Sequence, residues 1–250
     1  MVVWPHPLIF AHRGASAHAP ENTLSAFEKA LKQGAHAIEL DAKLSADGQI
    51  VVIHDATVNR TTDGKGRVSG LDLAALRELD AGSYFSEQFR GETIPTLGEV
   101  FEMTIGTRVL INVELTNYST PNDNLVERVC ELVKRFGLEN RVLLSSFLVS
   151  NLIQARSLLP ETPQGLLALK GWLGWWSRSF GFNFGNYEAL HPNLRNVTAR
   201  QVARVHRLNR RVHVWTVNLA EDMFRLFAWG VDGLFTDDPL LAIDVLNTRP

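Results

Sequence analysis

Ala37-Ile38-Glu39-Leu40-Asp41 places two acids inside an apolar run that has the pattern of a β-strand. In a strand, residues i and i+2 point to the same face, so Glu39 and Asp41 point together and Leu40 points away. Carboxylates that converge on one spot repel one another unless a cation lies between them. The run therefore predicts a strand that contributes ligands to a metal site.

Other polar side chains stand at the ends of apolar runs in the same way. Asn112-Val113-Glu114 closes one such run, His12 follows Ile9-Phe10-Ala11, and His54 follows Val51-Val52-Ile53. The catalytic residues of a (β/α)₈ barrel lie at the carboxyl ends of its strands. The pattern therefore favours a TIM barrel with these side chains gathered at one end.

The rest of the chain alternates strands with helices of about 10–15 residues, which is typical of βαβ units and a parallel sheet. Strands are expected at 37–44, 49–55, 109–115, 142–146, 165–169, 189–192, 212–218 and 233–237, and the main helices at 24–31, 97–105, 124–136, 150–159, 198–208 and 220–229. A doubly wound open sheet would usually carry a glycine-rich phosphate loop after its first strand, and the sequence has no such fingerprint. The α/β barrel is the better interpretation.

Residues 56–95 break this rhythm. Thr61-Thr62-Asp63-Gly64-Lys65-Gly66 has the composition of a loop, and only 72–79 has the pattern of a short helix. We interpret this part as a small insertion at the mouth of the barrel, after the second strand region. A length of 250 residues is typical of one TIM barrel, and no linker divides the chain, so we expect residues 1–250 to form a single domain.

Composition excludes several classes of function. The formal net charge of −2 gives no electrostatic footprint for nucleic acid or for an anionic membrane surface. No apolar stretch approaches the roughly 20 residues that span a bilayer. Residues 1–7 lack the features of a secretory signal, so a cytoplasmic location is expected.

Cys130 is the only cysteine and lies in a helical pattern, which indicates a buried, unreactive thiol.

The acids Glu39, Asp41 and Glu114 are the candidate metal ligands. A single acid at a strand end is usually a solvated rim residue, but three of them with Asn112 nearby favour a metal site. Ligation by oxygen alone favours one divalent cation, Mg²⁺ or Ca²⁺, with Mn²⁺ as a further option. Zinc is disfavoured because the cluster contains no thiol.

His12 and His54 are the candidate acid–base pair. Two imidazoles beside three acids could protonate an alkoxide leaving group and deprotonate an attacking oxygen near neutral pH. Arg13 offers a bidentate fork for phosphate oxygens. The alternative for Arg13 is an ordinary salt bridge inside the barrel.

These residues belong to an ordered series that resembles a known family. The series is His12-Arg13-Gly14, Pro20-Glu21-Asn22-Thr23, Glu39-Leu40-Asp41, His54-Asp55, Asn112-Val113-Glu114, Trp215-Thr216-Val217-Asn218, Gly230-Val231-Asp232-Gly233 and Thr236-Asp237. It is similar to the glycerophosphodiester phosphodiesterases, particularly the bacterial cytoplasmic type, over nearly the whole chain.

The resemblance implies a TIM barrel that hydrolyses glycerophosphodiesters to glycerol 3-phosphate and an alcohol. It implies a divalent ion on the three acids, acid–base roles for His12 and His54, and a phosphate-binding Arg13. It also implies that Trp215 walls the glycerol side of the pocket, whereas the residues alone are equally consistent with a core aromatic at that position.

The chain departs from the family pattern at Thr116, where members commonly carry a lysine two residues after the third acid. Lys43 or Lys170 are candidates to replace it. Two other functions therefore stay open: a lysophospholipase D-like enzyme that acts on lysolipids, and a degenerate barrel that only binds glycerol phosphates.

The segment 171–181 is rich in aromatic residues, with Trp172, Trp175, Trp176 and Phe180 at helical spacing. This spacing favours a helix that packs its rings on the barrel. The alternative is a lid for an acyl chain or a patch that makes transient contact with a membrane.

Overall fold

The computed structural model describes residues 6–248 of the chain. Residues 1–5 of the N-terminal stretch 1–7, which was interpreted above as lacking a secretory signal, lie outside the described residues. Within 6–248, no helix has both the length and the apolar character needed to cross a membrane.

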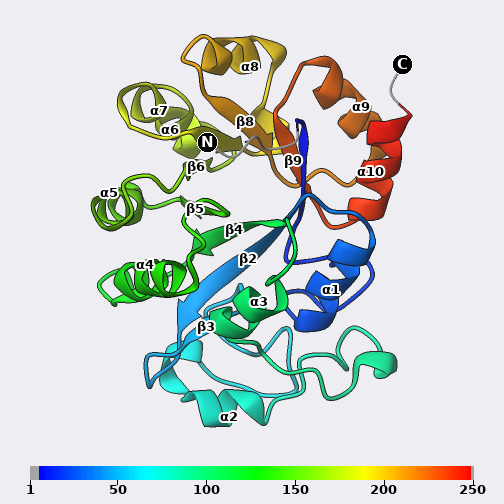
Figure 1. Ribbon diagram of the computed structural model, residues 1–250, viewed down its shortest axis with the longest axis vertical. Coiled ribbons are helices and arrows are strands. Elements are labelled where there is room, and N and C mark those ends of the chain that lie inside the picture. The colour runs from blue at the N-terminus through cyan, green and yellow to red at the C-terminus, as the bar shows by residue number, and fades with distance from the viewer. Residues whose placement is uncertain (1–5, 249–250) are drawn as a thin grey trace.

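Eight parallel strands close into a barrel within the described residues, as expected from the sequence (Figure 1). Each strand is hydrogen-bonded to the next in chain order, and β1 pairs with both β2 and β9, so no edge is left open. The strands are β1 (Leu8–Ala11), β2 (Ala37–Leu44), β4 (Leu110–Leu115), β5 (Val142–Ser146), β6 (Gln164–Ala168), β7 (Ala189–Pro192), β8 (Arg211–Val214) and β9 (Gly233–Thr236). The architecture is a TIM barrel.

Helices cover the outside of the barrel, and the cores lie between the two layers and inside the barrel. The main helices are α1 (Leu24–Lys32), α3 (Leu97–Met103), α4 (Leu125–Phe136), α5 (Val149–Leu158), α8 (Ala199–His206), α9 (Ala220–Ala228) and α10 (Pro239–Asn247). Their starts follow local chemistry: Thr96 and Glu99 form a capping box at α3. The last helix, α10, was not anticipated, although Asp238 caps it and Pro239 stands at its first position. Cys130 is buried in α4, as expected.

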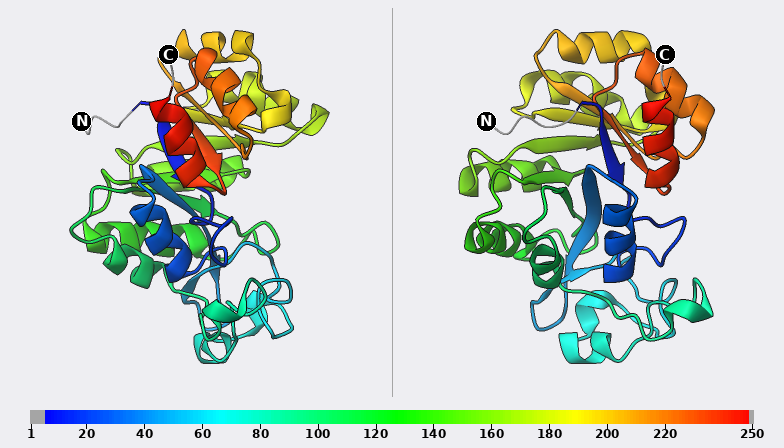
Figure 2. Two further views of the ribbon diagram at one scale, coloured as in Figure 1. Left: turned by 90° about the vertical axis from the view of Figure 1, so that its right-hand side faces the viewer. Right: turned by 45° about the vertical axis from the view of Figure 1, so that its right-hand side comes forward.

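The insertion forms a small lobe at one end of the barrel, drawn in cyan and teal in Figures 1 and 2. It begins with β3 (Ile50–Val52), which pairs antiparallel with the outer part of β2. It continues through α2 (Leu73–Arg77) and two short 3₁₀ turns, η1 (Val68–Gly70) and η2 (Glu87–Phe89). Val58, Val68 and Leu76 give the lobe a buried core of its own.

This arrangement corrects one sequence-based expectation. The strand predicted at 49–55 is shorter than expected and stands outside the barrel, so His54 does not end a barrel strand. An apolar run of this length fits an antiparallel strand as well as a buried parallel one, and periodicity alone cannot separate the two.

The aromatic segment is a second correction. Residues 171–181 do not form one helix packed on the barrel but the 3₁₀ turn η3 (Trp172–Gly174) and the short helices α6 (Trp175–Arg178) and α7 (Phe180–Phe184). Ser179 breaks the helical run with φ −125° and ψ −98°. Trp172 is 84% exposed and Phe184 is 83% exposed. The helical spacing therefore does not bring the rings onto one buried face.

Candidate active site

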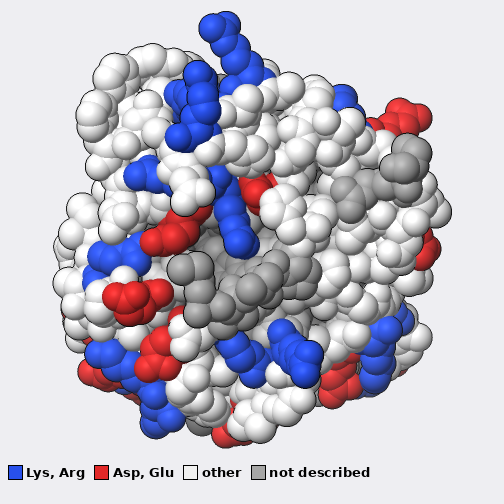
Figure 3. Space-filling model, turned by 45° about the horizontal axis from the view of Figure 1, so that its top comes forward, with Lys and Arg blue, Asp and Glu red and all other residues white. Residues whose placement is uncertain are grey.

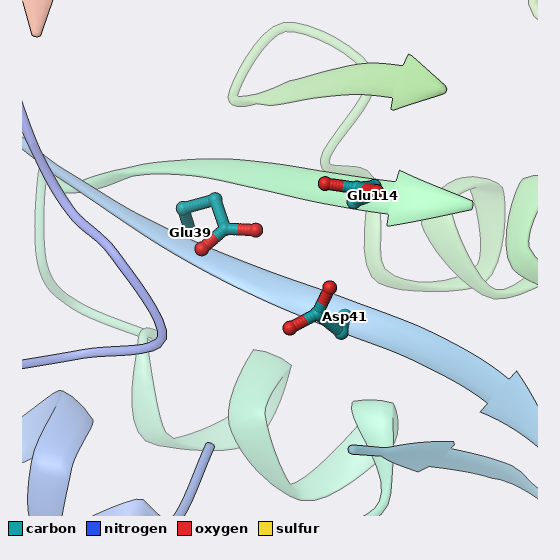
Figure 4. Close-up of side chains that lie close together, drawn as sticks. All are labelled: Glu39, Asp41 and Glu114. Carbon is teal, nitrogen blue, oxygen red and sulfur yellow. The ribbon is translucent and has the colours of Figure 1, made fainter. Parts of the chain in front are cut away.

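The register of β2 and β4 brings the three acids together. Glu39 pairs with Asn112, and Asp41 pairs with Glu114 two residues further on, so the four side chains lie on the same face of the parallel ladder. Figure 4 shows Glu39 and Asp41 on one strand and Glu114 on the next, with their carboxylates turned toward one another. One oxygen atom from each of the three carboxylates lies within 4.8 Å of the other two.

The electrostatics of this cluster fit a divalent cation. Burial and the charges of Asp41 and Glu114 raise the pKa of Glu39 well above its ordinary value. Burial and the charge of Asp41 raise the pKa of Glu114 to about 8. Asn112 donates from Nδ2 to the hydroxyl of Ser145 at 2.9 Å, while its buried Oδ1 has no hydrogen-bond donor. A cation at this point would relieve the carboxylate repulsion and could take the Asn112 oxygen as a neutral ligand.

Arg13 lies against the acids and is held from several sides. Its backbone N–H donates to Glu39 Oε2 at 2.8 Å, and its Nη1 donates to Glu21 at 2.8 Å. Its Nε lies 3.3 Å from Asp41 Oδ2. Burial opposes the charge of Arg13, but the charges of Asp41, Glu21 and Glu39 outweigh it and raise the pKa of the guanidinium. The salt bridge considered as the alternative for Arg13 is therefore present.

His12 is oriented by an acid that sequence reasoning did not assign. Its Nδ1 lies 2.7 Å from Asp237 Oδ1, which also accepts from Ser16 at 3.1 Å, while Asn218 donates to Oδ2 at 2.5 Å. Burial opposes ionisation of Asp237, but the hydrogen bond and charge of His12 and the other donors lower its pKa. An ionised carboxylate beside Nδ1 favours the tautomer that carries its proton on that nitrogen.

His54 has the same kind of partner. Its Nδ1 lies 2.6 Å from Asp55 Oδ1. Arg60 donates from Nε to Asp55 at 2.8 Å and from Nη1 to Glu21 at 2.7 Å. Hydrogen bonds from Arg60 lower the pKa of Asp55 despite partial burial. The insertion lobe and the β1 loop are thus joined by Arg60 and Glu21, a link that no local motif indicates.

One cavity of about 80 Å³ brings together the predicted residues other than Asp41, whose carboxylate lies beside those of Glu39 and Glu114. It is lined by His12, Arg13, Glu39, His54, Asn112, Glu114, Ser145, Phe147, Leu167, His191, Trp215 and Phe235. Trp215 donates from Nε1 to the His191 carbonyl at 2.7 Å and meets Phe147 edge to face at 5.7 Å. The ring of Trp215 is therefore a wall of the cavity and not a fully buried core aromatic.

Two further side chains, those of Tyr118 and Lys43, lie near the acid cluster. Tyr118 donates to Glu114 Oε1 at 2.7 Å, a contact that the sequence did not suggest. Lys43 shares the face of β2 with Glu39 and Asp41, and its Nζ donates to the carbonyl and the hydroxyl of Thr116 at 2.6 and 3.0 Å. Of the two lysines considered as replacements at Thr116, Lys43 is the one that reaches this position, while Lys170 is exposed in the loop after β6.

The chain is similar to known phosphodiesterases in sequence and in structure. The family model for the glycerophosphoryl diester phosphodiesterase family matches residues 12–241. The chain is 38% identical over 240 residues to a glycerophosphodiester phosphodiesterase of Caldanaerobacter subterraneus subsp. tengcongensis, which covers 96% of this chain and 98% of that relative. It is 36% identical over 240 residues to a glycerophosphodiester phosphodiesterase of Bacillus altitudinis, with 95% and 97% covered.

Among solved structures, a phosphodiesterase of Oleispira antarctica in complex with its product sn-glycerol-3-phosphate superposes with a TM-score of 0.89. The two chains are 31% identical, and the match covers 97% of this chain and 98% of that one.

Proposed function

The chain belongs to the glycerophosphoryl diester phosphodiesterase family, and from this premise we propose that it uses one divalent cation and two histidines to hydrolyse glycerophosphodiesters to glycerol 3-phosphate and an alcohol. The observation that carries the proposal is the single cavity lined by His12, His54, Glu39 and Glu114. The product complex of the Oleispira antarctica relative supports a small-molecule glycerol phosphate as the ligand of such a site.

Glu39, Asp41 and Glu114 would hold the cation, with Asn112 Oδ1 as a further oxygen ligand. The donor set is all oxygen, which suits Mg²⁺, Ca²⁺ or Mn²⁺. When bound, such an ion neutralises phosphate charge and acidifies a coordinated hydroxyl. Tyr118 fixes the orientation of Glu114, and Lys43 adds a buried positive charge on the same strand face.

The two histidines would carry the proton transfers. One accepts the proton of the attacking oxygen at Nε2, and the other donates a proton from Nε2 to the departing alkoxide. Asp237 and Asp55 hold the opposite nitrogens, so each ring presents Nε2 to the substrate. The protons balance over one turnover, because the first histidine gains the proton of the attacking oxygen, the second loses one to the leaving alcohol, and exchange with solvent restores both.

Arg13 and Trp215 would position the substrate. The Arg13 guanidinium is oriented by Glu21 and Asp41 at the edge of the cavity, where its charge would attract a phosphate oxygen. The Trp215 indole, braced by Phe147 and by the His191 carbonyl, would cover the apolar face of the glycerol unit.

The test is release of glycerol 3-phosphate from glycerophosphocholine and glycerophosphoethanolamine, with EDTA, Mg²⁺, Ca²⁺ or Mn²⁺. We expect no release of glycerol 3-phosphate in EDTA and restored release when a divalent cation is added. The Glu114→Ala variant should show no release with any cation. Glu102→Ala, which removes an exposed acid on α3, is the matched control and should keep full activity. Equal turnover of Glu114→Ala and wild type would contradict the metal assignment.

Lysolipid hydrolysis is the second candidate, and the exposed aromatic segment favours it. Comparing the rates on glycerophosphocholine and lysophosphatidylcholine separates the two substrates. Binding of glycerol 3-phosphate without turnover of either substrate would identify the degenerate barrel instead. The cytoplasmic location expected from the sequence stays a prediction.

A further inference from the structure

Residues 169–184, which include the aromatic segment 171–181, form an exposed apolar surface together with part of α5. The proposed reaction does not use this surface. Trp172, Trp175 and Phe184 are 84%, 58% and 83% exposed. Phe180 contacts Trp175 at 6.1 Å between ring centroids and stacks on Phe184 at 6.0 Å, so the rings are continuous. Exposed aromatic rings in contact with one another usually mark a binding surface.

The apolar surface extends onto α5. A hollow of about 460 Å³ lies between α5 and α7, lined mainly by Leu152, Ile153, Trp176, Phe180, Phe184 and Tyr187. Ile153 is itself 65% exposed. Figure 1 shows α5, α6 and α7 along the left side of the barrel, between α4 and α8.

The charge of this part of the chain is strongly asymmetric. Residues 162–219 contain eight Lys and Arg residues and a single acid, Glu188, although the whole chain has a net charge of −2. The cations are Lys170, Arg178, Arg195, Arg200, Arg204, Arg207, Arg210 and Arg211. Lys and Arg side chains gather at the α8 end of the molecule in Figure 3.

Several of these cations are built into the aromatic surface. Arg178 donates to the carbonyls of Leu169 and Gly171 at 2.5 and 2.6 Å. Arg204 on α8 donates to the carbonyl of Arg178, and the Arg210 guanidinium lies 5.0 Å from the Phe182 ring centroid. Arg178 and Arg204 are therefore hydrogen-bonded to the backbone of the segment that carries the exposed rings, and Arg210 lies against the buried Phe182 of the same segment.

We propose that α6, α7 and the adjoining loops, residues 169–184, together with the cations of α8 and its flanking loops, bind the surface of a bilayer that contains anionic lipid. Trp and Phe side chains favour the boundary between headgroups and acyl chains, and each Lys or Arg near an anionic surface adds about 1 kcal/mol. A second copy of the chain fits this surface less well, because two faces rich in arginine would repel each other. Lys170 and Trp172 follow β6, so this contact would place the membrane beside the open end of the barrel.

The test is sedimentation of the full chain with vesicles of phosphatidylcholine, with and without phosphatidylglycerol. We expect binding only to the anionic vesicles, and release in about 1 M NaCl, where the Debye length falls to about 3 Å. The double variant Trp172→Ser/Phe184→Ser and the charge variant Lys170→Glu/Arg195→Glu should each weaken binding by about tenfold or more. Ile105→Ser, which removes a 67% exposed residue outside this surface, is the matched control and should bind like wild type.

Three results would overturn the proposal. The first is the absence of sedimentation with anionic vesicles, and the second is equal binding by wild type and both variants. The third is a concentration-dependent dimer that the Trp172→Ser/Phe184→Ser variant abolishes, with no vesicle binding by wild type, which would assign the surface to self-association. Thermal unfolding by circular dichroism confirms that each variant is folded.

Discussion

Gly14 shows how tightly one residue of the His12-Arg13-Gly14 motif is constrained. Its φ of +84° is left-handed, and a Cβ at this position would lie 2.6 Å from the backbone carbon and the Cβ of Ala26. The preceding Arg13 is also left-handed, with φ 57°. This turn aims the Arg13 N–H at Glu39, so the glycine supports the site through backbone shape alone.

Replacing Gly14 separates strain from steric contact. We expect Gly14→Ala to lower the free energy of unfolding by about 1–3 kcal/mol for the left-handed backbone, with a further loss from the clash with Ala26. Gly91→Ala is the matched control, because its φ of +85° is the same and no atom lies within 4 Å of the added Cβ. Denaturant unfolding of the two variants measures the difference, and equal losses would show that the contact with α1 is unimportant.

The histidine pair gives the most direct test of chemistry. His12→Ala and His54→Ala should each lower kcat by about 10²–10⁴-fold, because each removes one proton transfer. His18→Ala is the matched control, since His18 pairs with Asp238 and does not line the cavity. Steady-state kinetics on glycerophosphocholine give the answer, and near-normal turnover of both active-site variants would exclude the acid–base assignment.

At the scale of single residues, the sequence predicted which candidate side chains lie together better than it predicted the contacts that hold them in place. Strand alternation fixed the common face of Glu39 and Asp41, since that inference needs only the period of a β-strand. The Asp237 partner of His12 lies 225 positions away in the chain and meets it only because β1 and β9 are neighbours in the closed barrel. Such a pairing follows from topology and not from local pattern.

At the scale of elements, the insertion lobe supplies His54 while the barrel supplies the acids. β3 adds to β2 on its outer part, so one long strand belongs to both units. Arg60 then ties the lobe to the loop after β1 through Asp55 and Glu21. The relative position of the two histidines therefore depends on a bridge between elements.

Breaking that bridge should affect catalysis more than folding. We expect Arg60→Met to lower kcat by about tenfold to a hundredfold, because a shift of about 1 Å in a catalytic group has an effect of this size. Arg67→Met, another exposed arginine of the lobe, should leave kcat unchanged. Initial rates at saturating substrate give kcat for both variants. An unchanged kcat for Arg60→Met would show that other contacts position the lobe.

Element boundaries were predicted well where burial and periodicity agree, and poorly elsewhere. β2 and β5 match the expected ranges, because each is a short buried run between clear turn residues. The prediction of one packed helix over residues 171–181 was wrong, because periodicity alone cannot reveal the break at Ser179 or the exposure of the rings. The orientation of β3 was equally inaccessible, since a short apolar run carries no sign of strand direction.

At the scale of the whole molecule, the acid cluster makes stability depend on pH. The pKa of Glu114 is raised from 4.5 to about 8 in the folded protein, so the folded state holds its proton more tightly than the unfolded state. The stability from this proton is complete below about pH 4.5 and is lost as the pH rises through 8. The contribution of Glu114 to the free energy of unfolding of the metal-free protein should fall by up to about 1.4 kcal/mol per pH unit across this window.

A bound divalent cation should reverse this trend, because it binds the ionised carboxylates and competes with protons. We expect Ca²⁺ or Mg²⁺ to raise Tm more at pH 8 than at about pH 5. Glu114→Gln should flatten the pH dependence of the metal-free protein. Differential scanning calorimetry with and without EDTA measures all three, and an identical pH profile for Glu114→Gln and wild type would contradict the assignment.

That residues 1–250 form one domain stays a prediction. Leu76 is fully buried in the core of the lobe, and Leu76→Ala should cost about 2–5 kcal/mol. In a single cooperative unit this loss lowers the midpoint of one shared unfolding transition. Two separate transitions, with only one shifted by Leu76→Ala, would show that the lobe unfolds independently.

The placement of His54 outside the barrel has a consequence for how such enzymes diversify. The three acids lie on β2 and β4, whose backbone pairing is indispensable to the closed barrel. His54, in contrast, belongs to a surface lobe that is attached at the end of β2. Recombination at the base of that lobe would exchange one of the two proposed acid–base residues in one event and leave the strands that carry the acid cluster intact. The lobe is thus a module through which evolution, or a protein engineer building chimaeras, could vary leaving-group preference on an inherited scaffold.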